Sequence, residues 1–187
     1  MRVDGRKMKL YHKIQTVFKR DPVTKHKTLL NEYSIPEVQF LRKCSWIFTE
    51  KVDGTNIRIM WDGENITFSG KTDNSHIPSF LVTKLNNRFM TIEQRQKFKG
   101  KFPDGVCLYG EGYGAKIQGC GGNYRQDQDF VLFDVRVGDW WLNRDAVEGI
   151  AKDLGIDVVP IIGEGMLDDM VIMTEKGFKS QWGDFIA

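Results

Sequence analysis

Residues 48–61 combine a turn with a strand pattern, and this combination limits what the surrounding chain can form. The dipeptide Asp53-Gly54 is a typical hairpin turn, and it follows closely on Lys51. Over residues 55–61, Thr, Ile, Ile and Trp alternate with Asn, Arg and Met, which is the period of a half-buried strand. The pattern places Lys51 at a strand end beside a turn, where a rigid element can aim its amine.

The simpler interpretation is a β-hairpin whose turn contains Lys and Asp by chance, because exposed lysines are common. The string Lys-Val-Asp-Gly-Thr-Asn at residues 51–56 favours a reactive role for Lys51 instead. It resembles the Lys-x-Asp-Gly signature of the covalent nucleotidyltransferases, which include the polynucleotide ligases and the RNA capping enzymes. With Thr-Asn after the glycine, it is most similar to the ATP-dependent RNA ligases.

Strand and helix patterns follow one another without a regular β-α-β order, which favours an α+β fold with antiparallel sheets. The ligase resemblance implies the same class: a nucleotidyltransferase (ligase adenylation) fold, with antiparallel sheets flanked by helices and the nucleotide site between the sheets. We find no repeat and no low-complexity linker, so we expect one domain over residues 1–187. The expected strands are 46–52, 55–61, 65–69, 106–109, 130–135 and 156–162, and the expected helices are 36–43, 79–98, 143–154 and 167–174. We expect a capping box from Ser34 at the start of the first helix, with Leu41 facing the core, a cap from Asn143 on the third, and Gly177 at the end of the last.

The composition is that of a globular protein. The chain has 187 residues, of which 41% are hydrophobic and 28% charged. No apolar run approaches the length that spans a membrane, and the N-terminus lacks the apolar segment of a signal peptide. We therefore expect a cytoplasmic protein without a membrane partner. The three Cys and three His have no metal-ligand spacing, which predicts reduced thiols and no zinc site.

Charge is unevenly distributed along the chain. Residues 1–30 carry nine Lys and Arg against two Asp, a net charge of +7, whereas the remainder carries eighteen against twenty-three acids, a net charge of −5. A basic N-terminal arm ahead of a mildly acidic body fits contact with a phosphate backbone. A terminus that only improves solubility fits equally well.

The resemblance implies a role for each residue of the first motif. Lys51 is the expected nucleophile on the α-phosphate of ATP, and its amine must be deprotonated to attack. Asp53 and Asn56 match family residues that order the metal and its water shell. Together with Lys51, the flanking Glu50 and Val52 are the expected contacts with the nucleotide.

Three later motifs follow in the order of the family, and each also has a simpler explanation. Lys71, in Ser-Gly-Lys-Thr at 69–72, matches a basic residue that contacts phosphate, but a lysine at a hairpin end is usually solvated surface. Glu111, in the glycine-rich stretch 109–114, matches a carboxylate that contacts the ribose or the metal, but it could be a stray acid in a turn. Phe133 matches a phenylalanine that stacks on adenine, but it could be core.

The resemblance implies an ATP-dependent RNA ligase adenylyltransferase domain that needs ATP and Mg²⁺ (or Mn²⁺). Lys51 would take AMP from ATP and pass it to an RNA 5′-phosphate, and a 3′-hydroxyl would then displace the AMP. Its partner would be RNA with such ends, and we expect a monomer. Whether such a ligase would serve RNA repair or another role stays open.

Relatives continue past a segment like residues 182–185 into a Glu-Gly motif and a Lys-x-Lys strand, whereas this sequence stops at Ala187. We therefore expect an incomplete domain that is weak at self-adenylation and at joining RNA. The similar Glu148-Gly149 lies too close to Phe133 and inside a helix pattern, so we reject it. The alternatives are a degenerate ligase-like module that binds nucleotide or RNA without turnover, a DNA nick ligase and a capping guanylyltransferase; the Thr-Asn after Asp53-Gly54 disfavours the last two.

Overall fold

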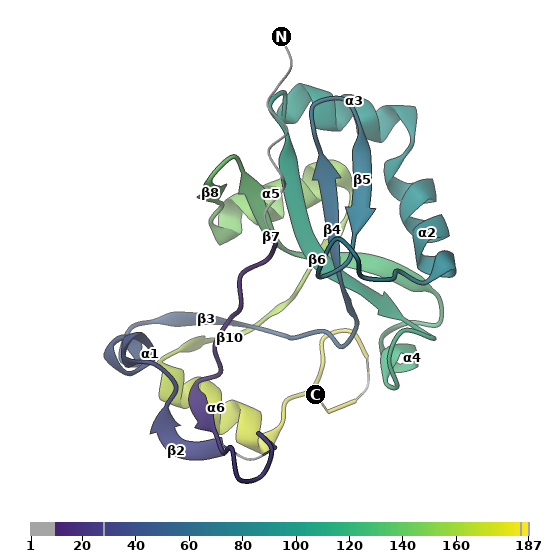
Figure 1. Cartoon of the computed structure of the whole chain (residues 1–187). Helices are drawn as coiled ribbons and strands as arrows, with labels where there is room; N and C mark the ends of the chain where they lie inside the picture. Colours follow the sequence, from purple (N-terminus) through teal and green to yellow (C-terminus); the bar gives the residue numbers. More distant parts are fainter. Residues whose placement is uncertain (1–9, 28, 184, 187) are drawn as a thin grey trace. The chain divides into compact units, whose positions relative to one another are not determined.

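The computed structural model describes residues 10–27, 29–183 and 185–186 (Figure 1). The chain divides into two compact units, and each is described by itself. Of the described residues, the first unit takes 10–11, 51–160, 181–183 and 185, and the second takes 12–27, 29–50, 161–180 and 186. That residues 1–187 act as one domain stays a prediction.

A mostly antiparallel sheet forms the centre of the first unit. Its strands lie in the order β5-β4-β6-β7-β8, and the short β9 pairs with β7 in parallel (Figure 1). The bounds are β4 Thr55–Trp61, β5 Ile66–Ser69, β6 Val106–Gly114, β7 Gln128–Val137, β8 Trp140–Trp141 and β9 Asp157–Val158. The α+β class with antiparallel sheets is therefore confirmed.

Three helices pack their apolar residues against one face of this sheet. They are α2 Ser79–Phe89, α3 Ile92–Lys101 and α5 Arg144–Leu154, and a single turn of helix, α4, spans Gly121–Tyr124. Ile57 and Ile59 of β4 are fully buried, and they join Leu81 of α2 and Leu154 of α5 in one hydrophobic core. Alternate residues of β4, Asn56 among them, point to the opposite face, so the Asn56 side chain is separated from this core.

The second unit contains two small antiparallel pairs. Strand β1 (Phe18–Arg20) pairs with β2 (Leu29–Tyr33), and β3 (Trp46–Thr49) pairs with β10 (Ile161–Gly165). The helices of this unit are α1 Pro36–Leu41 and α6 Leu167–Lys176, which ends at Gly177 as the sequence predicts. The strand expected at 46–52 ends at Thr49, and Lys51 therefore lies in a connecting loop.

Three predictions about helices are wrong. The helix expected at 79–98 is interrupted after Phe89, because Thr91 caps a new helix by accepting a hydrogen bond from the Gln94 amide at 3.2 Å. At α1 the expected Ser34 capping box does not form, since Pro36 takes the first helical position and makes Ile35 the N-cap. Leu41, expected in the core, is exposed.

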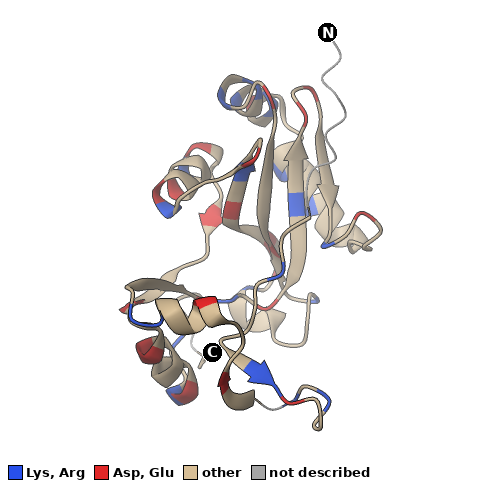
Figure 2. Cartoon of the chain, turned by 60° about the vertical axis from the view of Figure 1, so that its left-hand side comes forward, with Lys and Arg blue, Asp and Glu red and all other residues tan. Residues whose placement is uncertain are grey.

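The basic N-terminal arm is only partly described, because residues 1–9 and 28 lie outside the described residues. In the described part, Lys19 and Arg20 give β1 its blue colour in Figure 2. Lys19 pairs with Glu32 at 2.7 Å, and Arg20 donates to the His26 carbonyl at 3.1 Å. These two cations thus already have partners within the hairpin.

Within the described ranges, no helix is long and apolar enough to cross a membrane.

Candidate active site

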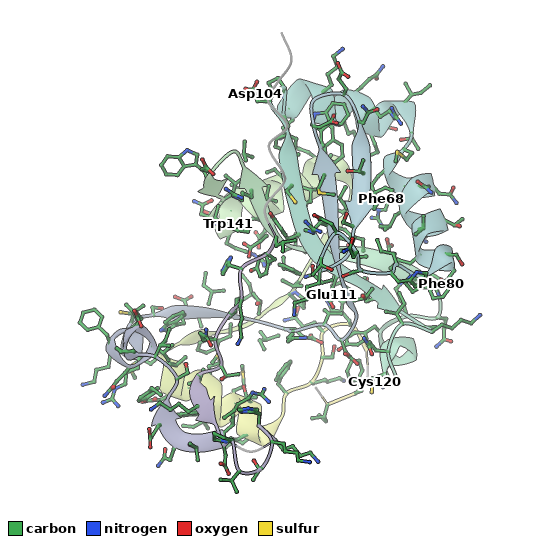
Figure 3. All side chains as sticks on the ribbon, in the orientation of Figure 1. Phe68, Phe80, Asp104, Glu111, Cys120 and Trp141 are labelled. Atoms are coloured by element: carbon green, nitrogen blue, oxygen red, sulfur yellow. The ribbon has the colours of Figure 1, made fainter. Side chains whose placement is uncertain are left out.

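Asn56 and Glu111 lie directly opposite each other on the neighbouring strands β4 and β6. Their side chains therefore share one face of the sheet, where Cβ atoms of opposite residues are about 5 Å apart. This face is the one turned away from Ile57 and the hydrophobic core. Figure 3 labels Glu111 on its strand. The fold thus brings together two of the residues that the sequence predicts for the metal.

Gly54 brings the Lys51 turn against the same place. A Cβ atom added at Gly54 would lie 2.4 Å from the Gly112 carbonyl oxygen and 2.7 Å from Cγ of Glu111. Only glycine allows so close an approach of the two backbones. The packing brings the charges of Lys51 and Asp53 near enough to Glu111 to act on its ionisation. Lys51 and Asp53 are themselves exposed.

Burial raises the pKa of Glu111 from 4.5 to about 7. The nearby Lys51 cation opposes this rise, whereas the negative charge of Asp53 adds to it. A carboxyl group that is costly to ionise, next to one cation and one further carboxylate, is a common arrangement in functional sites. A divalent cation would favour the ionised form of Glu111.

The amide oxygen of Asn56 is the atom that best fits a metal or its water shell. Asn56 Oδ1 is buried and has no hydrogen-bond partner among the described residues. A buried acceptor without a partner is costly and often marks a place for an ion or an ordered water. The donor set of Asn56, Glu111 and Asp53 is all oxygen, which suits Mg²⁺ or Mn²⁺. No group of three or more His, Cys, Asp or Glu that could hold a metal ion by itself occurs in the described part of the chain.

Two residues that sequence reasoning missed hold the turn in place. Gln118 donates to the Gly54 carbonyl at 3.1 Å, and the Asp53 amide donates to the Tyr124 hydroxyl at 3.2 Å. Gln118 has a φ of 64°, a left-handed conformation that only a few per cent of residues other than glycine adopt. The glycines around 119–122 signal a polar loop, but not which turn that loop will contact.

Phe133 reaches this face through a β-bulge. In the β6–β7 register, Tyr109 pairs with Asp134 and Gly110 pairs with Leu132, so Phe133 is an extra residue without a partner. A bulge of this kind re-aims side chains and often lies beside an active site. Phe133 is half-buried and packs against a cluster that includes Val52. Its burial therefore fits neither a fully buried core residue nor a fully open surface for stacking.

Tyr11 is a further residue that sequence reasoning did not assign to the site. Its ring lies edge-on to Phe133, with centroids 5.0 Å apart, and its hydroxyl donates to the carboxylate of Asp134. It also contacts the Trp141 ring, labelled in Figure 3 on β8, at a centroid distance of 5.4 Å. Tyr11 thus touches both residues that the bulge presents.

The remaining predicted residues are placed less directly. Lys71 is exposed on the loop after β5. Val52 is buried in the cluster that Phe133 contacts. Glu50 belongs to the second unit, where its buried carboxylate accepts a hydrogen bond from Ser180 at 2.7 Å. Glu148 is not part of the Asn56–Glu111 pair, since it lies on α5 and pairs with Arg144 at 2.6 Å.

A comparison with protein families matches residues 45–182 to the model described as RNA ligase. The chain belongs to the RNA ligase family. The matched segment contains Lys51, Asn56, Lys71, Glu111 and Phe133. No protein with a curated description matched this RNA ligase family chain.

Solved structures of the Naegleria gruberi RNA ligase share the fold. A mutant with ATP and Mn matches with a TM-score of 0.65 and 21% identity over 81% of this chain and 46% of that chain. The structure with PPi gives a TM-score of 0.63 and 22% identity, over 81% and 47%. A mutant with AMP and Mn gives a TM-score of 0.63 and 18% identity, over the same shares. This chain therefore spans about half the length of the Naegleria protein.

Proposed function

We propose that the chain is the adenylyltransferase domain of an ATP-dependent RNA ligase and that Lys51 carries the AMP. The observation that supports this most is the packing of Gly54 against Glu111, which sets the Lys51 turn beside the Asn56–Glu111 pair. Membership of the RNA ligase family supports the same reaction. The three groups that the chemistry requires are a nucleophile, a set of metal ligands and a surface for the base, and all have candidates in the first unit.

In the first step, the deprotonated amine of Lys51 attacks the α-phosphorus of ATP. A nitrogen–phosphorus bond forms as the bond to the departing pyrophosphate breaks, and the amine loses one further proton. Lys51 is exposed, so ATP can reach its amine without a rearrangement of the core. The backbone bonds from Gln118 and to Tyr124 fix the turn that carries the amine, which favours a productive approach.

Asn56, Glu111 and Asp53 are the residues that would hold Mg²⁺ or Mn²⁺. When bound, the cation would neutralise charge that develops on the phosphates. Lys71 would add a point charge at the phosphates, since lysine cannot form the planar two-bond contact of arginine. Phe133 would offer one face to adenine, with Val52 in the cluster behind it.

In the later steps, AMP passes from Lys51 to the 5′-phosphate of an RNA end, and a 3′-hydroxyl displaces it. Two observations support a nucleotide and RNA as partners: the family of this chain, and the ATP, AMP and Mn found with the Naegleria RNA ligase. We propose that the protein acts as a monomer in the cytoplasm.

Incubation with ATP labelled at the α-phosphate, followed by a denaturing gel, tests the proposal. We expect a labelled protein band that forms with the wild-type chain and is absent from Lys51→Arg, which keeps the charge. GTP labelled in the same way is the matched control, and preferential labelling by GTP would favour the capping reaction. ATP binding by calorimetry without any labelled band would favour a module that binds without turnover. A joining assay on nicked DNA against nicked RNA separates the two ligase classes.

A further inference from the structure

Arg58 is a fully buried cation in the middle of β4, two residues after Asn56. Its exposed fraction is 0%. Nε donates to the Gly70 carbonyl at 2.9 Å, and Nη2 donates to Asp73 at 2.8 Å. The third nitrogen, Nη1, is buried and has no hydrogen-bond partner among the described residues. The side chain of Asp73 is 53% exposed, so the anion of this pair remains largely in solvent.

A buried guanidinium is a costly choice for a strand interior. Arginine stays charged at all ordinary pH values, and taking that charge out of water is unfavourable. The bonds to Gly70 and Asp73 offset part of this cost, but the unpaired Nη1 adds to it. Stability alone does not explain Arg58, since an apolar residue in a buried ion pair's place is often neutral or better.

Both bonds of Arg58 end on one loop, the segment 69–75 that carries Lys71. They attach to Gly70, directly before Lys71, and to Asp73, two residues after it. The loop also closes on itself, because the Thr72 amide donates to Ser75 Oγ at 2.9 Å. The backbone on both sides of Lys71 is therefore held, whereas the Lys71 side chain is exposed.

The same loop lies beside the Asn56 backbone. A Cβ added at Gly70 would meet Ser75 Cβ at 2.6 Å and the Asn56 carbonyl oxygen at 3.6 Å. Gly70 is thus packed between Ser75 and the strand that carries the predicted metal ligand. The guanidinium connects this strand to the loop through two donors at a fixed angle, a geometry that lysine cannot reproduce.

We propose that Arg58 is a positioning residue for phosphate recognition, which clamps the loop 69–75 so that the Lys71 amine faces the phosphates of ATP. Arg58 itself does not touch the nucleotide. The inference rests on the proposed function, in which Lys71 contacts phosphate. It adds a residue whose effect passes entirely through Lys71, and this makes it testable by combining substitutions at the two positions.

The test is a double-mutant cycle of Arg58→Lys and Lys71→Met, with the affinities for ATP and for adenosine measured by calorimetry. We expect each single variant to bind ATP about tenfold more weakly, the scale of one charged hydrogen bond. Adenosine affinity should stay unchanged, because it has no phosphate. In the Lys71→Met background, Arg58→Lys should add less than about a twofold loss, since the residue it positions is gone.

Losses in ATP affinity that multiply in the double variant, or an equal loss for adenosine, would overturn the inference in favour of a general structural role. If Lys71→Met alone leaves ATP affinity unchanged, the role of Lys71 fails and the inference fails with it, while the labelled band at Lys51 still reports separately on the proposed reaction. Circular dichroism checks the fold of each variant. Should Arg58→Lys not fold, Asp73→Asn replaces it in the cycle with the same expected results.

Discussion

Glu111 lies opposite Asn56 across β4 and β6, and burial raises its pKa to about 7. The ordinary pKa of a glutamate is 4.5, so the folded protein holds the Glu111 proton to higher pH than the unfolded chain does. The raised pKa means that the protonated form stabilises the fold, and this stability is lost as the pH rises from about 4.5 through 7. The fold therefore disfavours the ionised carboxylate of Glu111, which is the form that would bind a cation.

We predict that Glu111→Gln stabilises the metal-free protein at pH 8 and changes little at pH 4. Glutamine keeps the size of the side chain but cannot ionise, so the variant avoids the cost of a buried charge. The gain at pH 8 should be about 1–3 kcal/mol, measured by denaturant unfolding at both pH values. Glu175→Gln, at an exposed position on α6, is the control and should be neutral at both. Equal effects of the two variants at pH 8 would contradict the raised pKa of Glu111.

A second prediction concerns Phe133. Phe133→Leu should weaken ATP binding by about 1 kcal/mol, the scale of one aromatic stacking interaction. Phe130→Leu is the matched control, because Phe130 is fully buried in the core on the other face of β7. The control should lower the melting temperature and leave ATP affinity unchanged. If Phe133→Leu instead only melts lower in calorimetry, Phe133 is a core residue.

The third prediction follows from the contact of Gly54 with β6. Gly54→Ala places a methyl group 2.4 Å from the Gly112 carbonyl oxygen, so the turn has to move away from Glu111. A misplacement of about 1 Å can lower a rate about 10²-fold, and we expect a loss of that order in the rate of protein labelling by ATP. Gly100→Ala in α3 has nothing within 4 Å and should keep the rate while stabilising the helix by up to about 1 kcal/mol. Unchanged labelling in Gly54→Ala would show that this packing is not needed.

Local patterns predicted the elements best where one strong signal decides. The alternation over Thr55–Trp61 matches β4 at both ends, and Asn143 caps α5 as expected. The split of the helix after Phe89 was missed although Thr91 and Gln94 have the spacing of a capping box, because the apolar period continues across it. Local signals that agree with the tertiary structure are readable, and those that a longer pattern masks are not.

The candidate site was predicted in its residues but not in its geometry. Resemblance supplied Lys51, Asn56 and Glu111, yet these last two residues are 55 positions apart in the sequence, and their pairing depends on the register of two strands. No local signal announces the bulge at Phe133 or the contact with Tyr11, since both depend on long-range packing. In the sequence, Arg58 occupies one of the polar positions of the alternating pattern and looks like an ordinary exposed residue. Only its burial and its contacts in the structure distinguish it.

The central claim is that Lys51 carries the AMP, and mapping the modified residue tests it most directly. After incubation with ATP and Mn²⁺, the protein is quenched under conditions that preserve the phosphoramidate, digested and analysed by mass spectrometry. We predict AMP on the peptide that contains Lys51 and no adduct in Lys51→Ala, whose melting temperature should shift no more than that of a surface substitution. AMP on Lys71 or any other lysine, or an adduct that persists in Lys51→Ala, would contradict the account.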